Sequence, residues 1–397
     1  MASNTDSASQ RVFASLDEFR IEVPSWGFAN TGTRFGKFVQ PAAATNLAEK
    51  FSDAAQVNAL TGASPTLALH VLWDLPNGLA DVPAIHALEQ QYKIKAGSIN
   101  PNLFQDQQYK FGSIANPSAE IRQHAIRHLL DSVAIARALN SRDISLWIAD
   151  GSNYPGTQSI RNRIGWLEEA LKAAHAQLAP GQRLLIEYKP FEPAFYHTDI
   201  ADWGMSSELA RVAGPQARVL VDTGHHYSSQ NIEQLVAWLL HTGLLGGFHF
   251  NDRHYADDDL TLGSIDPYRI FRIFHEIHSG LAEGIAHDVA FMIDQSHNLK
   301  GKMEATVQTV VTAQELWLKS ALVDRAQLAG LQNSCSLVAA EELFRGAFWS
   351  DVRPLAAAWR EARGLAADPL AALRDSGYVE RVTSERGSRV SAVSSYA

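Results

Sequence analysis

The sequence contains a single cysteine, Cys335, among its 397 residues. One thiol excludes an intrachain disulfide and any zinc or iron–sulfur site built from several thiolates. Long apolar runs are also missing, because none approaches the ~20 residues that a helix needs to cross a bilayer. Residues 1–10 lack the charged-then-apolar order of a signal peptide. We therefore expect a cytoplasmic protein without a membrane partner.

Basic residues are fewer than acidic ones. The chain has 34 Lys+Arg against 43 Asp+Glu, which gives a formal net charge of −9. A protein held to DNA or RNA by phosphate neutralisation needs a basic face, so nucleic acid is not expected as a partner. With 46% hydrophobic and 19% charged residues, the composition is that of a globular protein that buries a large core.

Short apolar segments recur along the chain, and most are continuous rather than alternating. Continuous runs are typical of parallel strands covered on both faces. Segments with helical spacing lie between them, the clearest of which follows Asn116 and Pro117, read as a polar N-cap and a first-turn proline. The predicted strands are residues 21–24, 67–72, 94–98, 144–149, 184–188, 219–221, 247–250 and 289–293, and the predicted helices are 46–60, 116–136, 160–178, 231–240 and 267–281.

Alternation of strand and helix predicts a parallel sheet, and eight units is the number that closes an α/β barrel of the (β/α)8 TIM type. A doubly wound open sheet is the alternative, but no glycine-rich phosphate loop follows the first strand, where a dinucleotide-binding fold carries one. We expect a flexible N-terminal segment at 1–18, a catalytic barrel at 19–300, a helical extension for subunit contacts at 301–380 and a polar tail at 381–397.

Acidic or imidazole side chains end four successive strands in the second half of the barrel, namely Glu187, Asp222, His249 and Asp294. One carboxylate after a strand is commonly an N-cap for the next helix. Several together at a barrel mouth repel one another in a low dielectric unless a divalent cation offsets their charge. Mixed oxygen and imidazole ligands suit Mn²⁺, Mg²⁺, Co²⁺ or Zn²⁺. The pattern therefore favours a metal site.

A second candidate set shares Asp222 with the first. His225 follows Asp222 by three residues, and Asp257 and Asp259 form a D-x-D in a loop. In an extended loop, period two places these two aspartates on one side and leaves Asp258 in solvent. Alone they would read as a solvated acidic turn, but their adjacency to the first set favours two metal sites bridged by Asp222. For the nearby His226, His254 and His297 we expect structural roles.

Further polar and aromatic side chains end other strands. Lys189 follows Glu187 by two residues and so faces the same way, where it either stabilises an oxyanion or forms an internal ion pair. His70 is either a core histidine or a group for proton transfer on a hydroxyl. Trp73 and Asp74 follow it, and Trp147 ends strand four, where a tryptophan either packs in the core or stacks on a sugar ring.

The segments IEYKPFEP, VLVDTGHH, HFNDRHYADDDLTLGSIDP and MIDQSHN resemble the L-rhamnose isomerase family, within the wider xylose-isomerase-like barrels. The resemblance covers residues 19–298, and the helical extension has a similar length. It implies a metal-dependent aldose–ketose isomerase, usually a homotetramer, with two divalent ions per subunit, Mn²⁺ first among them. L-rhamnose and L-rhamnulose are the implied sugars, with broad acceptance of others such as L-mannose and the pair D-allose and D-psicose.

The resemblance also implies roles for individual residues. The family's structural-metal ligands fall on Glu187, Asp222, His249 and Asp294, and its catalytic-metal ligands on His225, Asp257 and Asp259 with Asp222 as the bridge. Lys189, Asp294, Asp222 and the ring-opening His70 are the implied catalytic residues. The implied substrate contacts are Lys189, Trp73, Asp74, Trp147 and Phe35, the last being an early-loop aromatic that caps a neighbouring subunit's site.

Three alternatives compete with this interpretation. A ketose 3-epimerase on the same barrel tends to use one metal and two glutamates, whereas Glu187 is the only glutamate among these strand-end residues. A metal-dependent nuclease is disfavoured by the net charge of −9 and by the lack of a basic mouth. A non-catalytic sugar-binding protein has no need of two metals that share a carboxylate.

Overall fold

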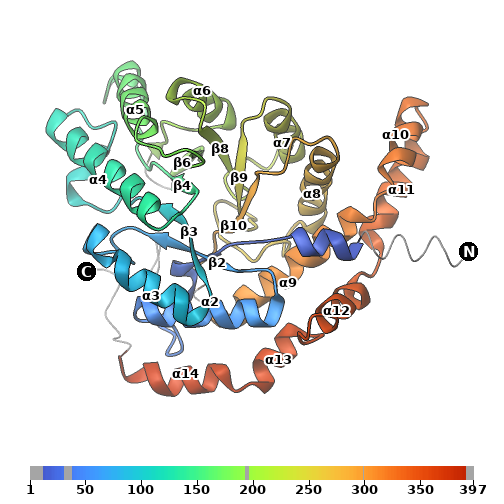
Figure 1. Ribbon diagram of the computed structural model, residues 1–397. Helices are drawn as coiled ribbons and strands as arrows, with labels where there is room; N and C mark the ends of the chain where they lie inside the picture. The colour runs from blue at the N-terminus through green and yellow to red at the C-terminus, as the bar shows by residue number, and fades with distance from the viewer. Residues whose placement is uncertain (1–11, 31–37, 193–195, 298, 390–397) are drawn as a thin grey trace, which may run out of the picture.

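The computed structural model describes residues 12–30, 38–192, 196–297 and 299–389. Eight parallel strands form one sheet in the order β1-β2-β3-β4-β5-β8-β9-β10 (Figure 1). The Glu22 amide donates to Phe291 O at 2.8 Å and the Ile293 amide donates to Glu22 O at 2.9 Å, so the first and last strands meet. The strands are β1 (Val23–Pro24), β2 (Thr66–His70), β3 (Lys95–Asn100), β4 (Asp143–Leu146), β5 (Arg183–Glu187), β8 (Ala217–Asp222), β9 (Leu245–Phe250) and β10 (Ala290–Ile293). The predicted TIM barrel is confirmed.

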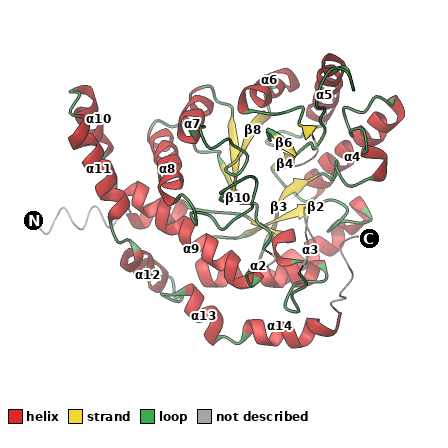
Figure 2. Ribbon diagram, turned by 180° about the vertical axis from the view of Figure 1, so that it is seen from behind, coloured by secondary structure: helices red, strands yellow, loops and turns green. Residues whose placement is uncertain are grey.

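Helices surround the barrel on its outside, as both views show (Figures 1 and 2). They are α2 (Leu47–Thr61), α3 (Val82–Tyr92), α4 (Ala119–Ala138), α5 (Ile160–His175), α6 (Trp203–Ala213), α7 (Ile232–His241) and α8 (Pro267–Ala282). Several begin at polar caps visible in the sequence: the side chain of Asn46 accepts from Glu49 N, and that of Asn231 accepts from Gln234 N. These bonds satisfy amides that have no partner within the helix.

Three details differ from the sequence-based expectation. Helix α4 begins at Ala119, two residues after Pro117, because the side chain of Asn116 accepts from Ser118 N in a turn that precedes the helix. Helix α6 was not predicted; it is short, and four of the five residues it buries are Ser or Ala, which are not read as core residues in a sequence. Helix α3 is short and buries only Val82, Ile85 and Glu89, which is too few for a clear period.

The side chains inside the barrel explain where the polar residues of the strands point. Leu185 on β5, Leu220 on β8 and Met292 on β10 pack together although β5 and β10 are not neighbours in the sheet. They therefore meet across the interior. Because side chains alternate along a strand, the residues two positions later lie on the same side. Those residues are Glu187, Asp222 and Asp294, which consequently face the mouth of the barrel.

The chain after the barrel is helical. Helix α9 (Lys302–Ala321) packs between α8 and α2. Helices α10 (Arg325–Asn333) and α11 (Leu337–Trp349) form an arm beside α8 (Figure 1), and Phe344 and Phe348 of α11 pack on Tyr268 and Phe271 of α8. The remaining helices α12 (Arg353–Glu361), α13 (Pro369–Asp375) and α14 (Tyr378–Arg386) run along the outside of α9 and α2. No helix of the described residues is both long and apolar enough to span a membrane.

Both ends of the described chain are more ordered than the sequence indicates. Residues 12–18 are helical rather than flexible: the Trp317 indole donates to Ser15 O at 3.0 Å and Leu16 is buried. At the other end, α14 continues past residue 381, where the polar tail was expected to begin. The Arg386 guanidinium there donates to both carboxylate oxygens of Asp53 at 2.8 and 2.9 Å. Long-range contacts that no local pattern reveals hold both segments.

Candidate metal centre

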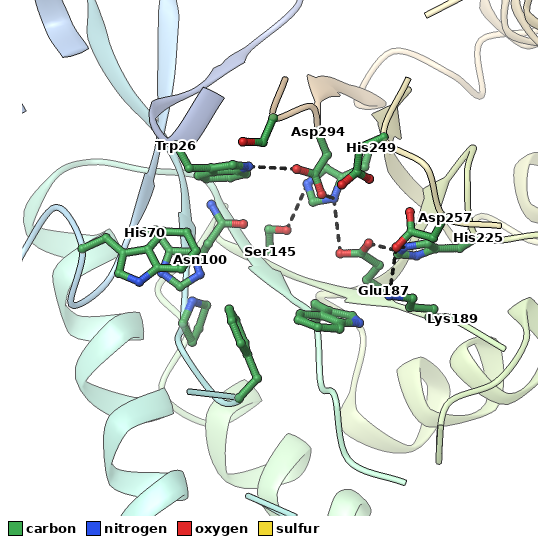
Figure 3. Close-up of a pocket in the computed structure, with 16 residues that line it drawn as sticks. Trp26, His70, Asn100, Ser145, Glu187, Lys189, His225, His249, Asp257 and Asp294 are labelled. Atoms are coloured by element: carbon green, nitrogen blue, oxygen red, sulfur yellow. Dashed lines mark hydrogen bonds and ion pairs between the residues drawn. The ribbon is translucent and has the colours of Figure 1, made fainter. Parts of the chain in front are cut away.

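A pocket of ≈130 Å³ lies at the carboxyl ends of the strands (Figure 3). Acidic and imidazole side chains form one half of it, and aromatic side chains form the other. Its lining includes Trp26, His70, Trp73, Asn100, Phe104, Ser145, Trp147, Glu187, Lys189, His225, His249, Asp257, Asp259 and Asp294. The structure therefore brings residues from both halves of the barrel into a single site.

The first group of potential ligands is Glu187, Asp222, His249 and Asp294, each of which offers an atom within 4.8 Å of the others. His249 Nδ1 lies 3.2 Å from Glu187 Oε2 and 3.8 Å from Asp294 Oδ2, while His249 Nε2 lies 3.4 Å from Ser145 Oγ. The imidazole therefore turns Nδ1 toward the carboxylates. This buried Nδ1 has no hydrogen-bond partner among the described residues.

The second group is Asp222, His225 and Asp257, whose ligand atoms satisfy the same 4.8 Å limit. His225 Nδ1 lies 3.0 Å from Tyr188 O, and since a carbonyl only accepts, Nδ1 carries the proton. The other ring nitrogen, Nε2, faces Asp257 Oδ2 at 3.3 Å and Asp222 Oδ2 at 4.0 Å, which makes it the nitrogen available to a metal. A backbone carbonyl behind a histidine in this way is typical of metal-binding imidazoles.

Asp222 belongs to both groups and is fully buried. Its Oδ1 accepts from Gly224 N at 2.6 Å and from Asn251 Nδ2 at 3.0 Å. These donors fix the carboxylate between the two groups, and Asn251 is a residue to which sequence analysis gave no role. Its signal was present, because it follows His249 by two residues and so shares its side of the strand.

The buried carboxylates of the two groups are stabilised by positive charge placed among them. Burial lowers the pKa of His225 and of His249, but the surrounding carboxylates outweigh it and raise the pKa of each to about 10. Burial and the neighbouring carboxylates raise the pKa of Asp222 to about 7. In the protein alone the acids thus draw protons onto both imidazoles and onto Asp222 itself. A divalent cation would supply the same charge without those protons.

Lys189 reaches the pocket as its spacing from Glu187 predicts. Its buried Nζ lies 2.9 Å from Asp257 Oδ2 and 5.2 Å from the centre of the Trp147 ring. The ion pair expected as one of two alternatives is therefore present, and the ammonium also faces the cavity. Trp147 lines the pocket beside it, so the aromatic ring and the cation form a single surface.

His70 lies on the opposite, aromatic wall. It stacks on Trp73 with ring centres 3.8 Å apart, and Trp26 contacts both rings edge-on. Burial lowers the pKa of His70 to about 4, so the ring is neutral near pH 7. Its Nδ1 lies 3.0 Å from Val71 O and must donate to it, which leaves Nε2 as an acceptor. The ring is therefore equipped to take a proton rather than to give one.

Asp74 does not line the pocket: its carboxylate accepts from Ser25 Oγ, Lys50 Nζ and the His70 amide, so it lies beneath the aromatic wall instead of facing a substrate. Phe35 falls outside the described residues.

Trp26 was not singled out in the sequence, yet its indole donates to Asp294 Oδ1 at 2.9 Å. Asp259 lines the pocket but is not one of the clustered ligands, and its φ of +49° shows that its loop is not extended as assumed.

Comparisons with known proteins agree with this architecture. A family model described as Xylose isomerase-like TIM barrel matches residues 67–283. A probable sugar isomerase of Rhizobium meliloti (strain 1021) is 39% identical over 94% of this chain and 88% of its own length. One from Mesorhizobium japonicum is 37% identical over 96% of this chain and 89% of its own. The solved structure of 3-keto-D-glucoside 4-epimerase from E. coli has a TM-score of 0.55 at 11% identity, covering 76% of this chain and 99% of that one, a likeness of fold alone.

Proposed function

Because the chain belongs to the xylose isomerase-like TIM barrel family, we propose that it is a divalent-metal-dependent sugar isomerase that interconverts an aldose and a ketose. The observation that carries this proposal is the pair of carboxylate–imidazole groups that share Asp222 at the barrel mouth. Relatives named as probable sugar isomerases match almost the whole chain, which supports the same activity.

The residues present fit two metal ions. The buried His249 Nδ1 lacks a hydrogen-bond partner among the described residues and points at carboxylates, as a ligand atom does. We assign Glu187, Asp222, His249 and Asp294 to one ion. We assign Asp222, His225 and Asp257 to the other, and we propose Asp259, which lines the same pocket, as its fourth ligand. Oxygen and imidazole donors suit Mn²⁺, and Co²⁺, Mg²⁺ and Zn²⁺ are further candidates.

When bound, two divalent ions would lower the pKa of a sugar hydroxyl or of a water molecule in the pocket. The chain's own residues then orient the substrate and carry protons. Lys189, held in place by Asp257, stabilises negative charge that develops on the carbonyl oxygen as hydrogen passes between C2 and C1. The acceptor nitrogen of His70 takes the proton of the ring hydroxyl during opening of the sugar.

Two further features of the site serve the same reaction. Trp26 fixes one oxygen of Asp294, so that this carboxylate keeps a constant position from which to accept and return a proton. Trp73, Trp147 and Phe104 line the pocket and provide ring faces for the apolar side of a sugar. Asp74 acts through His70, whose amide it holds, rather than by touching substrate.

We propose L-rhamnose and L-rhamnulose as the principal sugar pair, with acceptance of L-mannose and of D-allose and D-psicose. The support is the succession of strand-end motifs noted in the sequence. A change in one pocket contact alters discrimination by only ~1–3 kcal/mol, so related sugars remain substrates of such a site.

A substrate panel tests the proposal. The enzyme is stripped with a chelator and assayed with L-rhamnose, L-mannose, D-allose and D-xylose before and after Mn²⁺ is restored. We expect ketose to form from L-rhamnose, only with metal. No ketose from any of these sugars would refute the isomerase proposal, and conversion by metal-free protein would refute the mechanism.

The same experiment separates an epimerase from an isomerase. Incubation with D-psicose yields D-allose if hydrogen moves between C1 and C2, and yields its C3 epimer D-fructose if the enzyme is a ketose 3-epimerase. His225→Ala is the matched variant, since it removes only a ligand of the second group. We expect this variant to lose aldose formation.

We also propose that the protein is a homotetramer whose helical extension makes subunit contacts. The arm formed by α10 and α11 exposes Leu337, Val338 and Trp349, which are 69%, 76% and 71% accessible. Apolar side chains exposed to this degree on a projecting element indicate an interface. Light scattering should give four subunits for the wild type and fewer for a Leu337→Asp, Val338→Asp double variant. A monomeric wild type would refute this assembly.

A further inference from the structure

A second cavity, of ≈260 Å³, lies beside the candidate metal centre and shares a wall with it. Lys189, His225 and Asp257 line both cavities. The rest of the second cavity is built differently, because Arg253 lines it together with aromatic side chains that include Tyr227 and Tyr255. Nothing in the proposed isomerase reaction uses this space.

Arg253 is buried, and no carboxylate among the described residues forms a direct ion pair with it; Asp258, Asp252 and Asp257 act on it only at longer range. The residue is only 8% exposed, and its buried Nε has no hydrogen-bond partner within the part of the chain that the structure describes. The Arg253 backbone amide donates to Asp252, but within the described part of the chain the guanidinium has neither a hydrogen bond nor an ion pair. Buried arginines are almost always paired, because an unpaired buried charge is costly.

The acids nearest to Arg253 are already engaged by other donors. Asp252 accepts from Arg269 Nη2 at 2.5 Å and from the amides of Ile265 and Asp266 at 2.8 and 3.0 Å. Asp258 Oδ2 accepts from the amides of residues 254 and 255 at 2.6 and 2.8 Å. Asp257 is paired with Lys189 at 2.9 Å. The guanidinium therefore lies near three carboxylates whose direct partners are other groups, and these carboxylates act on it only at longer range.

The size and chemistry of the cavity define what it can hold. A water molecule occupies ~30 Å³ of liquid, so the volume accommodates a small polyatomic ion. The planar guanidinium matches the paired oxygens of a phosphate or a carboxylate better than any other common ligand. The exposed rings of Tyr227 and Tyr255, 53% and 87% accessible, flank the opening and could cover an organic group attached to the ion.

We propose that this cavity is an oxyanion-binding site in which Arg253 binds a phosphate or carboxylate group. The site adjoins the sugar pocket across the shared wall of Lys189, His225 and Asp257, and its existence does not depend on the isomerase proposal. The anion is either free or the charged end of a small metabolite. The bound anion would lie next to Lys189 and His225, which also line the candidate metal centre, so its negative charge would act on that centre.

Calorimetric titration of the metal-loaded, full-length protein tests the proposal at low ionic strength. Inorganic phosphate probes a free anion, and glycerol 3-phosphate probes the charged end of a metabolite. We expect saturable binding of one anion per subunit. Tighter binding of inorganic phosphate would identify the ligand as a free anion, and tighter binding of glycerol 3-phosphate would identify it as the charged end of a metabolite. Arg253→Gln should weaken binding at least tenfold, and the control Arg345→Gln, at an exposed ion pair on α11, should leave it unchanged. No saturable binding to the wild type would overturn the proposal, as would equal binding by Arg253→Gln, which would place the anion elsewhere.

Thermal melting provides a second readout that a purely structural arginine would not give. In anion-free buffer Arg253→Gln should melt at or above the wild-type temperature, because it removes an unpaired buried charge. Phosphate should raise the melting temperature of the wild type but not of this variant. Arg253→Lys keeps the charge without the paired donors, so it should retain part of the affinity. A variant that melts far below the wild type without anion would show that the guanidinium has an internal partner, and would overturn the proposal.

Discussion

Replacing Asp222 with asparagine should stabilise the metal-free protein and prevent its further stabilisation by metal. Asp222 is buried among the carboxylates of both groups, so its charge is unfavourable in the absence of a cation. Asparagine has the same shape, and its oxygen can still accept from Gly224 N and Asn251 Nδ2. The substitution therefore removes the charge and keeps the two hydrogen bonds to Oδ1, while only the second contact of Asn251 Nδ2, with Oδ2 at 3.1 Å, is lost.

The magnitude follows from the change in pKa on folding. Burial and the neighbouring carboxylates raise the pKa of Asp222 from 3.8 to about 7. At 1.36 kcal/mol per unit, a rise of about 3 units corresponds to about 4 kcal/mol. Between pH 3.8 and about 7 the folded state binds more protons than the unfolded state, so this group's contribution to stability is lost as pH rises through that window. The variant should match the wild type near pH 4 and exceed its stability by about 4 kcal/mol near pH 8.

Denaturant unfolding at pH 8 measures this difference, first with EDTA and then with Mn²⁺. A ligand at 100 times its dissociation constant adds ~2.7 kcal/mol per site, so metal should stabilise the wild type by at least that amount and the variant by much less. Asp252→Asn is the matched control. That aspartate is equally buried but pairs with Arg269, so its loss should destabilise by ~3–5 kcal/mol with or without metal.

Two outcomes would refute the reasoning. If Asp222→Asn destabilises the metal-free protein at pH 8, as Asp252→Asn should, the carboxylate serves the fold and not a cation. Equal stabilisation of wild type and variant by Mn²⁺ would show that the metal binds away from Asp222.

Three further predictions concern individual contacts. Asp294→Asn should lower turnover by more than 100-fold while the melting temperature changes little; near-wild-type turnover of the folded, fully metallated variant would contradict its assigned role. Trp26→Phe removes a hydrogen bond to a charged group, worth ~1.5–3 kcal/mol, so kcat/KM should fall by ~10- to 100-fold with an unchanged metal content by atomic absorption. His70 has its pKa lowered to about 4, so stability should fall as pH drops from 6.5 toward 4, and His70→Gln should flatten that slope in pH-dependent unfolding; an unchanged slope would exclude His70 as its origin.

The fold was predictable because its signals are local and repeated. Each of the eight strands appeared as an apolar run, and the observed strands deviate from those runs by only a few residues at their ends. Most predicted helices carried their own caps. Helix α6 was missed because it packs with small residues, and residues 12–18 because their partners Trp317 and Trp359 lie about three hundred residues away.

The carboxylate half of the candidate site was predictable for a related reason. In a parallel barrel every strand ends at the same face, and side chains alternate along each strand. The convergence of Glu187, Asp222 and Asp294 therefore follows once their strands are recognised. The aromatic half of the site was harder to predict from the sequence. Trp26 lies in a short 3₁₀ turn after β1, and no pattern in the sequence connects it with Asp294.

The sequence by itself thus determined the barrel, the end of the barrel that carries the chemistry and the residues that converge there, since these follow from strand order and side-chain period. Only the tertiary structure decided which nitrogen of each imidazole faces the cluster and that Asp74 lies beneath the pocket. It alone decided that Arg253 is buried with no direct ion pair among the described residues. Those outcomes depend on loop conformation and on contacts between distant segments, which are set by packing in three dimensions and leave no period in the chain.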